Sequence, residues 1–136
     1  MMITGKINKK YREAIEFFAS NLFTPQMKRH IEIRVRKRDL GTWHGFVSIE
    51  DYNVLNQPRS FVIELHKGDN EAEQLKTLAH ELVHVRQYAR NELNDEMNTW
   101  KGRYVDSDAI DYNDQPWEIE ANKLGNELYE LYTNKT

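Results

Sequence analysis

The first forty residues change from a helical to a strand pattern of apolar positions. The apolar side chains of residues 7–20 recur at helical spacing, at Tyr11, Ala14, Ile15 and Phe18. Thr24 and Pro25 together predict the N-cap and the first position of a short helical turn. From residue 31 to 35, apolar and charged side chains alternate, which predicts a strand with one exposed face.

Two further strands are predicted in the middle of the chain. They span residues 43–52 and 59–66, and a turn at 54–58 that contains Pro58 joins them. Three consecutive strands with short connections favour an antiparallel meander.

The second half of the chain is predicted to begin with a long helix. A continuous apolar stripe indicates a helix at 71–90, with Asp69 or Asn70 as its N-cap. Residues 91–115 are polar and irregular, and a loop of this length in a small domain is usually functional or flexible.

A last helix is predicted from Pro116 to about residue 132, with Asp114 available as its cap. Its apolar stripe consists of Trp117, Ala121, Leu124, Leu128 and Leu131. These elements together predict a single α+β domain over residues 1–136. It would contain an N-terminal helix, a small antiparallel sheet of about three strands, and the two later helices.

Composition narrows the possible chemistry. The chain has 136 residues, of which 39% are hydrophobic and 30% charged, as expected for one globular domain. It has no cysteine, so a tightly bound transition metal must use histidine and carboxylate ligands. The sequence shows neither a signal-peptide apolar region nor a membrane-span candidate, so a cytoplasmic protein without a membrane partner is expected.

Positive charge is concentrated near the N-terminus. Residues 1–40 carry ten Lys and Arg against four Asp and Glu, whereas the whole chain has a net charge of −3. The basic run R-V-R-K-R at 34–38 could contact nucleic acid or an acidic partner. A solvated strand face explains the run more simply, so a nucleic-acid partner is not the favoured interpretation.

The segment H-E-L-V-H at 80–84 carries the strongest functional signal. His80 and His84 are four residues apart, so a helix places both imidazoles on one face, where they can bind one Zn²⁺. Glu81 lies close enough to approach a metal-bound water as a general base. Two buried imidazoles without polar partners would be unfavourable, and a metal ion removes this penalty.

A catalytic zinc site needs a third protein ligand. Cysteine is absent, so the candidates are His30, His44, His66 and the acidic residues of the last helix.

In the last helix, Glu118 and Glu120 flank the apolar stripe on opposite sides, and periodicity alone does not choose between them. Asn122 lies one turn beyond Glu118 and could orient a ligating histidine. Gly125 lies on the same side and removes bulk where a second helix could approach. Both details favour Glu118, which leaves Glu120 as a surface or supporting carboxylate.

These two segments resemble the gluzincin metallopeptidases. H-E-L-V-H is followed by E-I-E-A-N at 118–122, which is similar to the family motif E-x-x-A-D. The resemblance implies a zinc site of His80, His84 and Glu118, with Glu81 as general base and a small antiparallel sheet beside the active-site helix. It also suggests a compact catalytic core of the kind found in bacteria and phages.

Asn122 departs from the family's aspartate. SprT-like and metzincin families use a third histidine, and none follows residue 84.

The expected activity is hydrolysis of peptide bonds in a peptide or protein substrate. Zn²⁺ would acidify and activate water, and Glu81 would accept its proton. Tyr104 and Tyr112 are the candidate donors to the oxyanion, with His66 behind them, although ordinary packing is the commoner role of a tyrosine.

The substrate is expected to dock as an added strand along a sheet edge within 43–52. Trp43 and Trp100 could line a subsite. The alternative function is a catalytically inactive, zinc-stabilised binding or regulatory protein. Such a protein could also contact nucleic acid through its basic N-terminal part.

Overall fold

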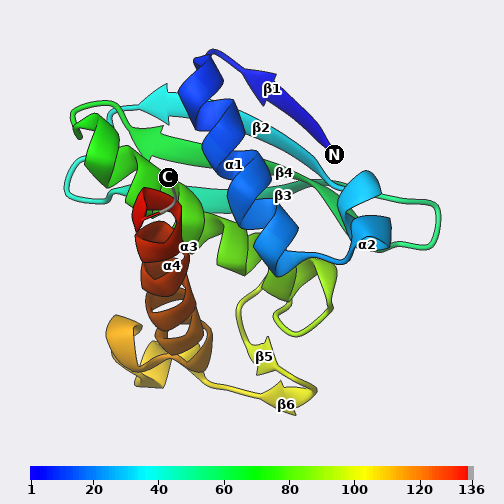
Figure 1. Ribbon diagram of the computed structural model, residues 1–136. Helices are drawn as coiled ribbons and strands as arrows, with labels where there is room; N and C mark the ends of the chain where they lie inside the picture. The colour runs from blue at the N-terminus through cyan, green and yellow to red at the C-terminus, as the bar shows by residue number, and fades with distance from the viewer. Residues whose placement is uncertain (135–136) are drawn as a thin grey trace.

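The computed structural model describes residues 1–134 (Figure 1). Residues 135 and 136, which the single-domain prediction included, lie outside the described part. The helices are α1 (Lys9–Leu22), α2 (Pro25–Arg29), α3 (Glu71–Ala89) and α4 (Pro116–Asn134). The main strands are β1 (Met2–Gly5), β2 (Glu32–Arg38), β3 (Gly45–Tyr52) and β4 (Pro58–His66). Between α3 and α4 lie the short strands β5 (Thr99–Trp100) and β6 (Arg103–Tyr104) and the 3₁₀ turns η1 (Ser107–Ala109) and η2 (Tyr112–Asp114).

The α+β class is confirmed, but the sheet is mixed rather than an antiparallel meander. Its strand order is β1-β2-β4-β3, so β4 lies between β2 and β3. The β2–β4 pair is parallel, and only the β3–β4 hairpin is antiparallel. The meander prediction was wrong because it used only the short connections. β4 contains three consecutive buried residues, Phe61, Val62 and Ile63, a pattern typical of a central strand covered on both sides.

Strand β1 was not predicted. It is four residues long and pairs in parallel with β2, with Ile3 opposite Ile33. A strand this short has too few positions to show an alternating pattern. It ends at Gly5, which has a φ of 114°. A Cβ atom on Gly5 would lie 2.1 Å from the carbonyl oxygen of Val35, so only glycine fits this close pairing.

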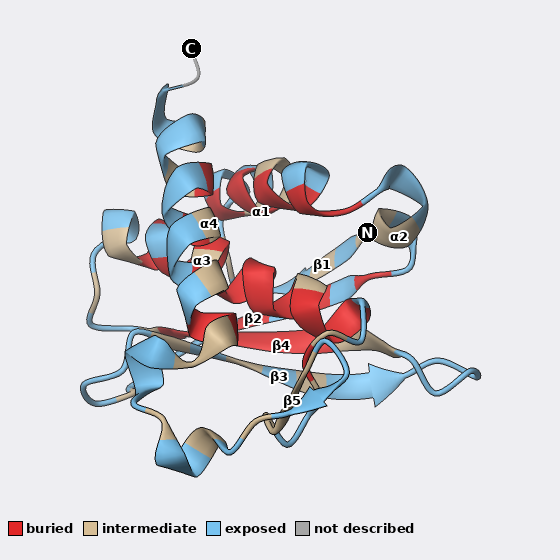
Figure 2. Cartoon of the chain, turned by 90° about the horizontal axis from the view of Figure 1, so that it is seen from below, coloured by how far each residue is buried: buried red, intermediate tan, exposed pale blue. Residues whose placement is uncertain are grey.

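The hydrophobic core lies between one face of the sheet and the helices. Helices α1 and α3 lie over the same face, and α4 packs across α3 (Figure 1). Buried residues line the inner sides of α1 and α3 and the strands beneath them (Figure 2). In β2 the expected alternation is confirmed, because Ile33 and Val35 are buried whereas Arg34 and Arg36 are exposed.

The helix caps explain where the helices begin. Asn8 caps α1, Thr24 caps α2 and Asn70 caps α3, each through its side-chain oxygen. Of the two candidates for α3, the cap is therefore Asn70. Asp114 is not the cap of α4, because it ends η2 and Gln115 intervenes.

The predicted stripe of α4 is buried at Trp117, Ala121 and Leu128 and partly buried at Leu124. Leu131 is 53% exposed, and the next residue, Tyr132, packs against the core instead. None of the helices within residues 1–134 is both long enough and apolar enough to cross a membrane.

The edge strand β3 is irregular at one end. Its register with β4 shifts between Ile49 and Asp51 and again before Tyr52, as a β-bulge does. The first half of the strand, from Gly45 to Ile49, keeps a regular register with β4.

Helices α3 and α4 pack closely together at Gly125. A Cβ atom built there would lie 3.0 Å from Cα and 3.2 Å from the backbone nitrogen of His80. The obstacle is backbone, which cannot move aside as a flexible side chain can. The absence of a side chain at Gly125, expected from the sequence, therefore lets α4 lie directly against the turn of α3 that carries His80.

We expect Gly125→Ala to destabilise the protein by about 1–3 kcal/mol, because the new methyl group pushes α4 away from α3. At an open helix position the same substitution would stabilise the helix by about 1 kcal/mol. Urea denaturation gives the sign of the change in the free energy of unfolding, which shows whether Gly125 lies in a close helix–helix contact or at an open helix position. Lys123→Ala, at an exposed position of α4, is the control and should leave stability nearly unchanged. A more stable Gly125→Ala protein would contradict the packing described here.

Candidate metal centre

Helix α3 presents its two histidines to α4. The apolar stripe of α3, including Leu78, Leu82 and Val85, is fully buried and fixes the rotation of the helix. His80 and His84 follow each other by one turn on the side that faces α4, and their ring centroids are 4.9 Å apart. His84 is buried and His80 is partly buried.

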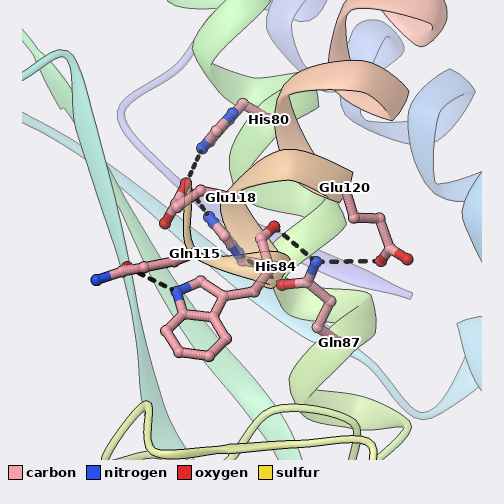
Figure 3. A network of polar contacts seen from close by, with 7 residues as sticks. His80, His84, Gln87, Gln115, Glu118 and Glu120 are labelled. Atoms are coloured by element: carbon pink, nitrogen blue, oxygen red, sulfur yellow. Dashed lines mark hydrogen bonds and ion pairs between the residues drawn. The ribbon is translucent and has the colours of Figure 1, made fainter. Parts of the chain in front are cut away.

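Glu118, in the first turn of α4, lies between the two imidazoles (Figure 3). One carboxylate oxygen, Oε1, is 3.1 Å from Nε2 of His80 and 3.1 Å from Nε2 of His84. The side chain is 1% exposed. Its neighbour Trp117 is fully buried and anchors the start of α4, which fixes the position of Glu118.

Glu120 occupies a different place. Its carboxylate accepts a hydrogen bond from the side-chain amide of Gln87 at 3.1 Å and lies 3.6 Å from the guanidinium of Arg86. It contacts neither histidine through a hydrogen bond or ion pair in residues 1–134. The geometry therefore brings Glu118, and not Glu120, to the two histidines.

The three side chains fit a transition-metal site. One ligand atom from each of His80, His84 and Glu118 can be chosen so that all three lie within 4.8 Å of one another, the one such group in the described chain. In a tetrahedral zinc site with bonds of about 2.0 Å, ligand atoms are about 3.3 Å apart. The observed 3.1 Å separations from Glu118 Oε1 are close to this value. Two imidazole nitrogens and a carboxylate oxygen are also the ligand set of catalytic zinc sites that keep a position open.

Gln87 orients His84, a role that was not predicted from the sequence. The fully buried Gln87 places its carbonyl oxygen 2.7 Å from Nδ1 of His84. Its amide nitrogen donates to the backbone oxygen of Trp117 at 3.0 Å (Figure 3). In a neutral His84 this contact keeps the proton on Nδ1 and leaves the Nε2 lone pair free for a metal. The available signal was the position of Gln87 three residues after His84, about one helical turn further along α3.

The charges of the cluster are strongly coupled. Burial raises the pKa of Glu118, but its hydrogen bonds with His80 and His84 outweigh burial and lower the pKa to about 2. Burial lowers the pKa of His84, but the Glu118 hydrogen bond and the charges of Glu81 and Glu118 raise it to about 9. Without a metal, the cluster thus holds a carboxylate and a protonated His84 at neutral pH, and metal binding there must release a proton.

Glu81 lies beside this cluster and lines two adjacent cavities. It is 6% exposed, and its carboxylate forms no hydrogen bond or ion pair within residues 1–134. Burial raises the pKa of Glu81, and the charge of Glu118 raises it further against the opposing effect of the histidines. A carboxylate with a raised pKa is well suited to accept a proton near neutral pH.

Gly45 brings the edge of the sheet close to Glu81. A Cβ atom on Gly45 would lie 2.4 Å from Cγ2 of Thr77 and 3.6 Å from Cγ of Glu81. Glycine is therefore required for the start of β3 to pack onto α3 at this point. As a result, the free edge of the sheet begins directly beside the candidate metal centre.

Of the two predicted tyrosines, the structure brings only Tyr112 to the site. Tyr112 lies on η2 and lines cavities together with Glu81, and its ring packs edge-on against Trp43 at 5.5 Å. Burial and the nearby charges of Glu118 and Glu81 raise the pKa of Tyr112, so its hydroxyl stays protonated and can donate a hydrogen bond. Tyr104 is 73% exposed on β6 and lines neither of these cavities, because the β5–β6 hairpin turns it outward.

The other candidate residues have different surroundings. His30, the C-cap of α2, and His66, which accepts a hydrogen bond from the backbone of Leu40, lie outside the metal-ligand group. Trp43 lines the site, whereas Trp100 packs against Trp117 with ring centroids 6.3 Å apart.

Asn122 also lines the cavity beside the histidines, but in the described chain it forms no hydrogen bond to either of them. The role that was predicted for Asn122 is instead performed by Gln87, at His84.

Several basic side chains of the run at 34–38, on β2, interact with neighbouring side chains. Arg34 pairs with Glu50, and Arg38 lies 2.9 Å from the carboxylate of Glu64. The ammonium of Lys37 lies over the ring of Tyr11, 4.4 Å from its centroid. These contacts are those of a solvated strand face.

Comparisons with protein-family models, curated proteins and solved structures found no match to this chain.

We expect Gln87→Leu to lower the affinity for Zn²⁺ about 10- to 100-fold, because His84 loses the acceptor that fixes its orientation. Affinity can be measured by competition with a chromogenic chelator. Gln115→Leu is the matched control, since Gln115 bonds to Trp117 and Ser107 and not to a histidine. The control should bind zinc nearly as well as the wild type. Equal losses in both variants would show a general packing defect rather than an effect through His84.

Proposed function

We propose that this protein is a zinc-dependent hydrolase of peptide bonds, of the gluzincin type. The observation that carries the proposal is the convergence of His80, His84 and Glu118 from two helices, with the buried carboxylate of Glu81 beside them. A purely structural site would have no use for an unpaired buried carboxylate next to its ligands. A hydrolase needs one, as the acceptor of the water proton.

His80, His84 and Glu118 would hold the ion. When bound, Zn²⁺ supplies Lewis-acid chemistry, because it lowers the pKa of water and polarises a carbonyl group. Glu81 accepts the proton of the attacking water and can pass it to the leaving amine. Gln87 holds the His84 ring in the orientation that directs Nε2 toward Glu118.

Tyr112 would assist the reaction as a hydrogen-bond donor. It shares both cavities with Glu81, and its raised pKa keeps the hydroxyl as a donor. A donor there stabilises the negative charge that develops on the carbonyl oxygen. The contact with Trp43 fixes the ring and thereby the direction of the hydroxyl.

The free edge of β3 gives the substrate a place to bind. β3 is the last strand of the sheet, so the backbone groups on its outer side are available to an added strand. The edge starts at Gly45, beside Glu81, and Phe46 and Val47 line the adjacent cavity. A peptide that pairs with this edge would present its backbone carbonyls to the metal centre.

The purified protein is expected to contain about one Zn²⁺ per chain, and Glu118→Ala should remove it, because a catalytic zinc site needs three protein ligands. Glu120→Ala, two residues away, should keep the metal. Zinc content after gentle purification, measured by inductively coupled plasma mass spectrometry, distinguishes these outcomes. Metal-free wild type, or loss of zinc from Glu120→Ala alone, would contradict the proposed ligand set.

Glu81→Gln should retain zinc and lower the rate of peptide hydrolysis about 10²- to 10⁴-fold, the range typical of general acid–base catalysis. The measurement is cleavage of a mixed peptide library, followed by mass spectrometry. Hydrolysis by the wild type that persists unchanged in Glu81→Gln would rule out this carboxylate as the base. A zinc-loaded wild type that cleaves nothing would instead favour a binding or regulatory role.

A further inference from the structure

Two cavities of different character meet at Glu81. They share the walls formed by Trp43, Gly45, Glu81 and Tyr112. A substrate bond held at Glu81 would therefore lie where the two cavities meet.

The smaller cavity includes the candidate metal centre. It has a volume of about 140 Å³, and its walls include His84 and Glu118 together with Phe46, Val47 and Met97. A volume below the range of about 300–1,000 Å³ that is usual for ligand pockets leaves no room for a long side chain beside these ligands. A long side chain of a substrate would therefore have to enter the larger cavity.

The larger cavity is polar. It has a volume of about 420 Å³ and extends from His80 and Glu81 along the N-terminal half of α3 toward Glu73. Asn122 and Asn126 of α4 and Thr42 form its opposite walls. A long side chain with a polar end can lie in this space with its end near Glu73.

Glu73 and Glu81 are the two carboxylates that line the polar cavity without an ion pair within residues 1–134. The Glu73 side chain is partly buried and lies toward the far end of the cavity from the metal centre. The two basic side chains beside it already have closer partners. His44 is held by Asp69 at 2.8 Å, with a smaller contribution of the Glu73 charge to its raised pKa, and the ammonium of Lys76 lies over the ring of Tyr129, 5.6 Å from its centroid.

We infer that the polar cavity is a specificity subsite that binds a Lys or Arg side chain of the substrate, next to the bond to be cleaved, through the Glu73 carboxylate. The inference rests on the proposed peptidase function and goes beyond it by naming the substrate class. A cation in the cavity pairs with Glu73, and its aliphatic stem lies along the Trp43 wall. An acidic side chain would face Glu73 and Glu81 and would be repelled.

The first test uses the zinc-loaded protein and a peptide library randomised around a central position. Mass spectrometry of the products should show Lys and Arg enriched at one position beside the cleaved bond. Cleavage without this enrichment, or with enrichment of Asp and Glu, would overturn the inference and leave the peptidase function standing.

The second test asks whether Glu73 causes the preference. For a selected Lys-containing peptide, Glu73→Gln should lower kcat/KM about tenfold, the effect of losing one charge-assisted hydrogen bond. The same peptide with norleucine in place of Lys should be cleaved equally by both proteins. Glu71→Gln is the matched control, because Glu71 lies in the same first turn of α3 but outside the cavity. Glu73→Lys should reverse the preference toward a Glu-containing peptide, a gain that misfolding cannot produce.

A binding measurement separates this inference from the proposed function. Zinc-loaded Glu81→Gln protein is titrated calorimetrically with the Lys and norleucine forms of one library-consensus peptide or, if the library is not cleaved, of an alanine-based peptide. The Lys form should bind about tenfold more tightly, and adding Glu73→Gln should abolish the difference. Equal affinities, or binding of neither peptide, would overturn the subsite. Absence of cleavage by the wild type with a retained Lys preference would overturn only the peptidase function.

Discussion

The contact between the start of α4 and the middle of α3 determines most of what this protein can do. Because Gly125 has no side chain, α4 can lie directly against the backbone of α3 at His80. That approach buries Glu118 between His80 and His84. Without it, the two histidines would lie on an α3 face with no carboxylate between them. The distance between two helices thus decides whether the candidate centre exists.

This arrangement makes opposing contributions to stability when no metal is bound. A carboxylate and an imidazolium have been removed from water, and burying such a pair often costs as much as its attraction returns. Here the attraction outweighs the effect of burial on the charged forms, since the pKa of Glu118 is lowered and that of His84 is raised. Gln87 contributes by bonding to Nδ1 of His84 and to the backbone oxygen of Trp117 at once. Glu81 has no such partner, and burial raises its pKa. Buried titratable groups with shifted pKa values that lie together in a cavity are a common property of functional sites.

The sequence predicted the helices well because their signals are local. The Asn and Thr caps and the apolar stripes of α1 and α3 all depend on residues within a few positions of one another. The sheet topology was not predicted, because the insertion of β4 between β2 and β3 depends on pairing between distant segments. The one local clue was the run of three buried residues at 61–63.

The same distinction applies to the site. The H-E-x-x-H spacing predicts two ligand candidates and a candidate base within five consecutive residues, and the choice of Glu118 over Glu120 drew on Asn122 and Gly125. Gln87 was missed because its partners lie about thirty residues away, on α4. Tyr104 and Tyr112 could not be distinguished, because the path of the chain between α3 and α4 decides which of them faces Glu81.

The bulge in β3 has a consequence for solubility. An unpaired sheet edge can pair with the edge of another molecule and begin aggregation. Here the register shifts after Ile49, and the strand continues through Glu50 and Asp51, whose charges oppose the approach of another edge. Only the part from Gly45 to Ile49 stays regular enough to act as a template. Along β3, the edge thus stays regular only where it borders the cavity and is interrupted beyond Ile49.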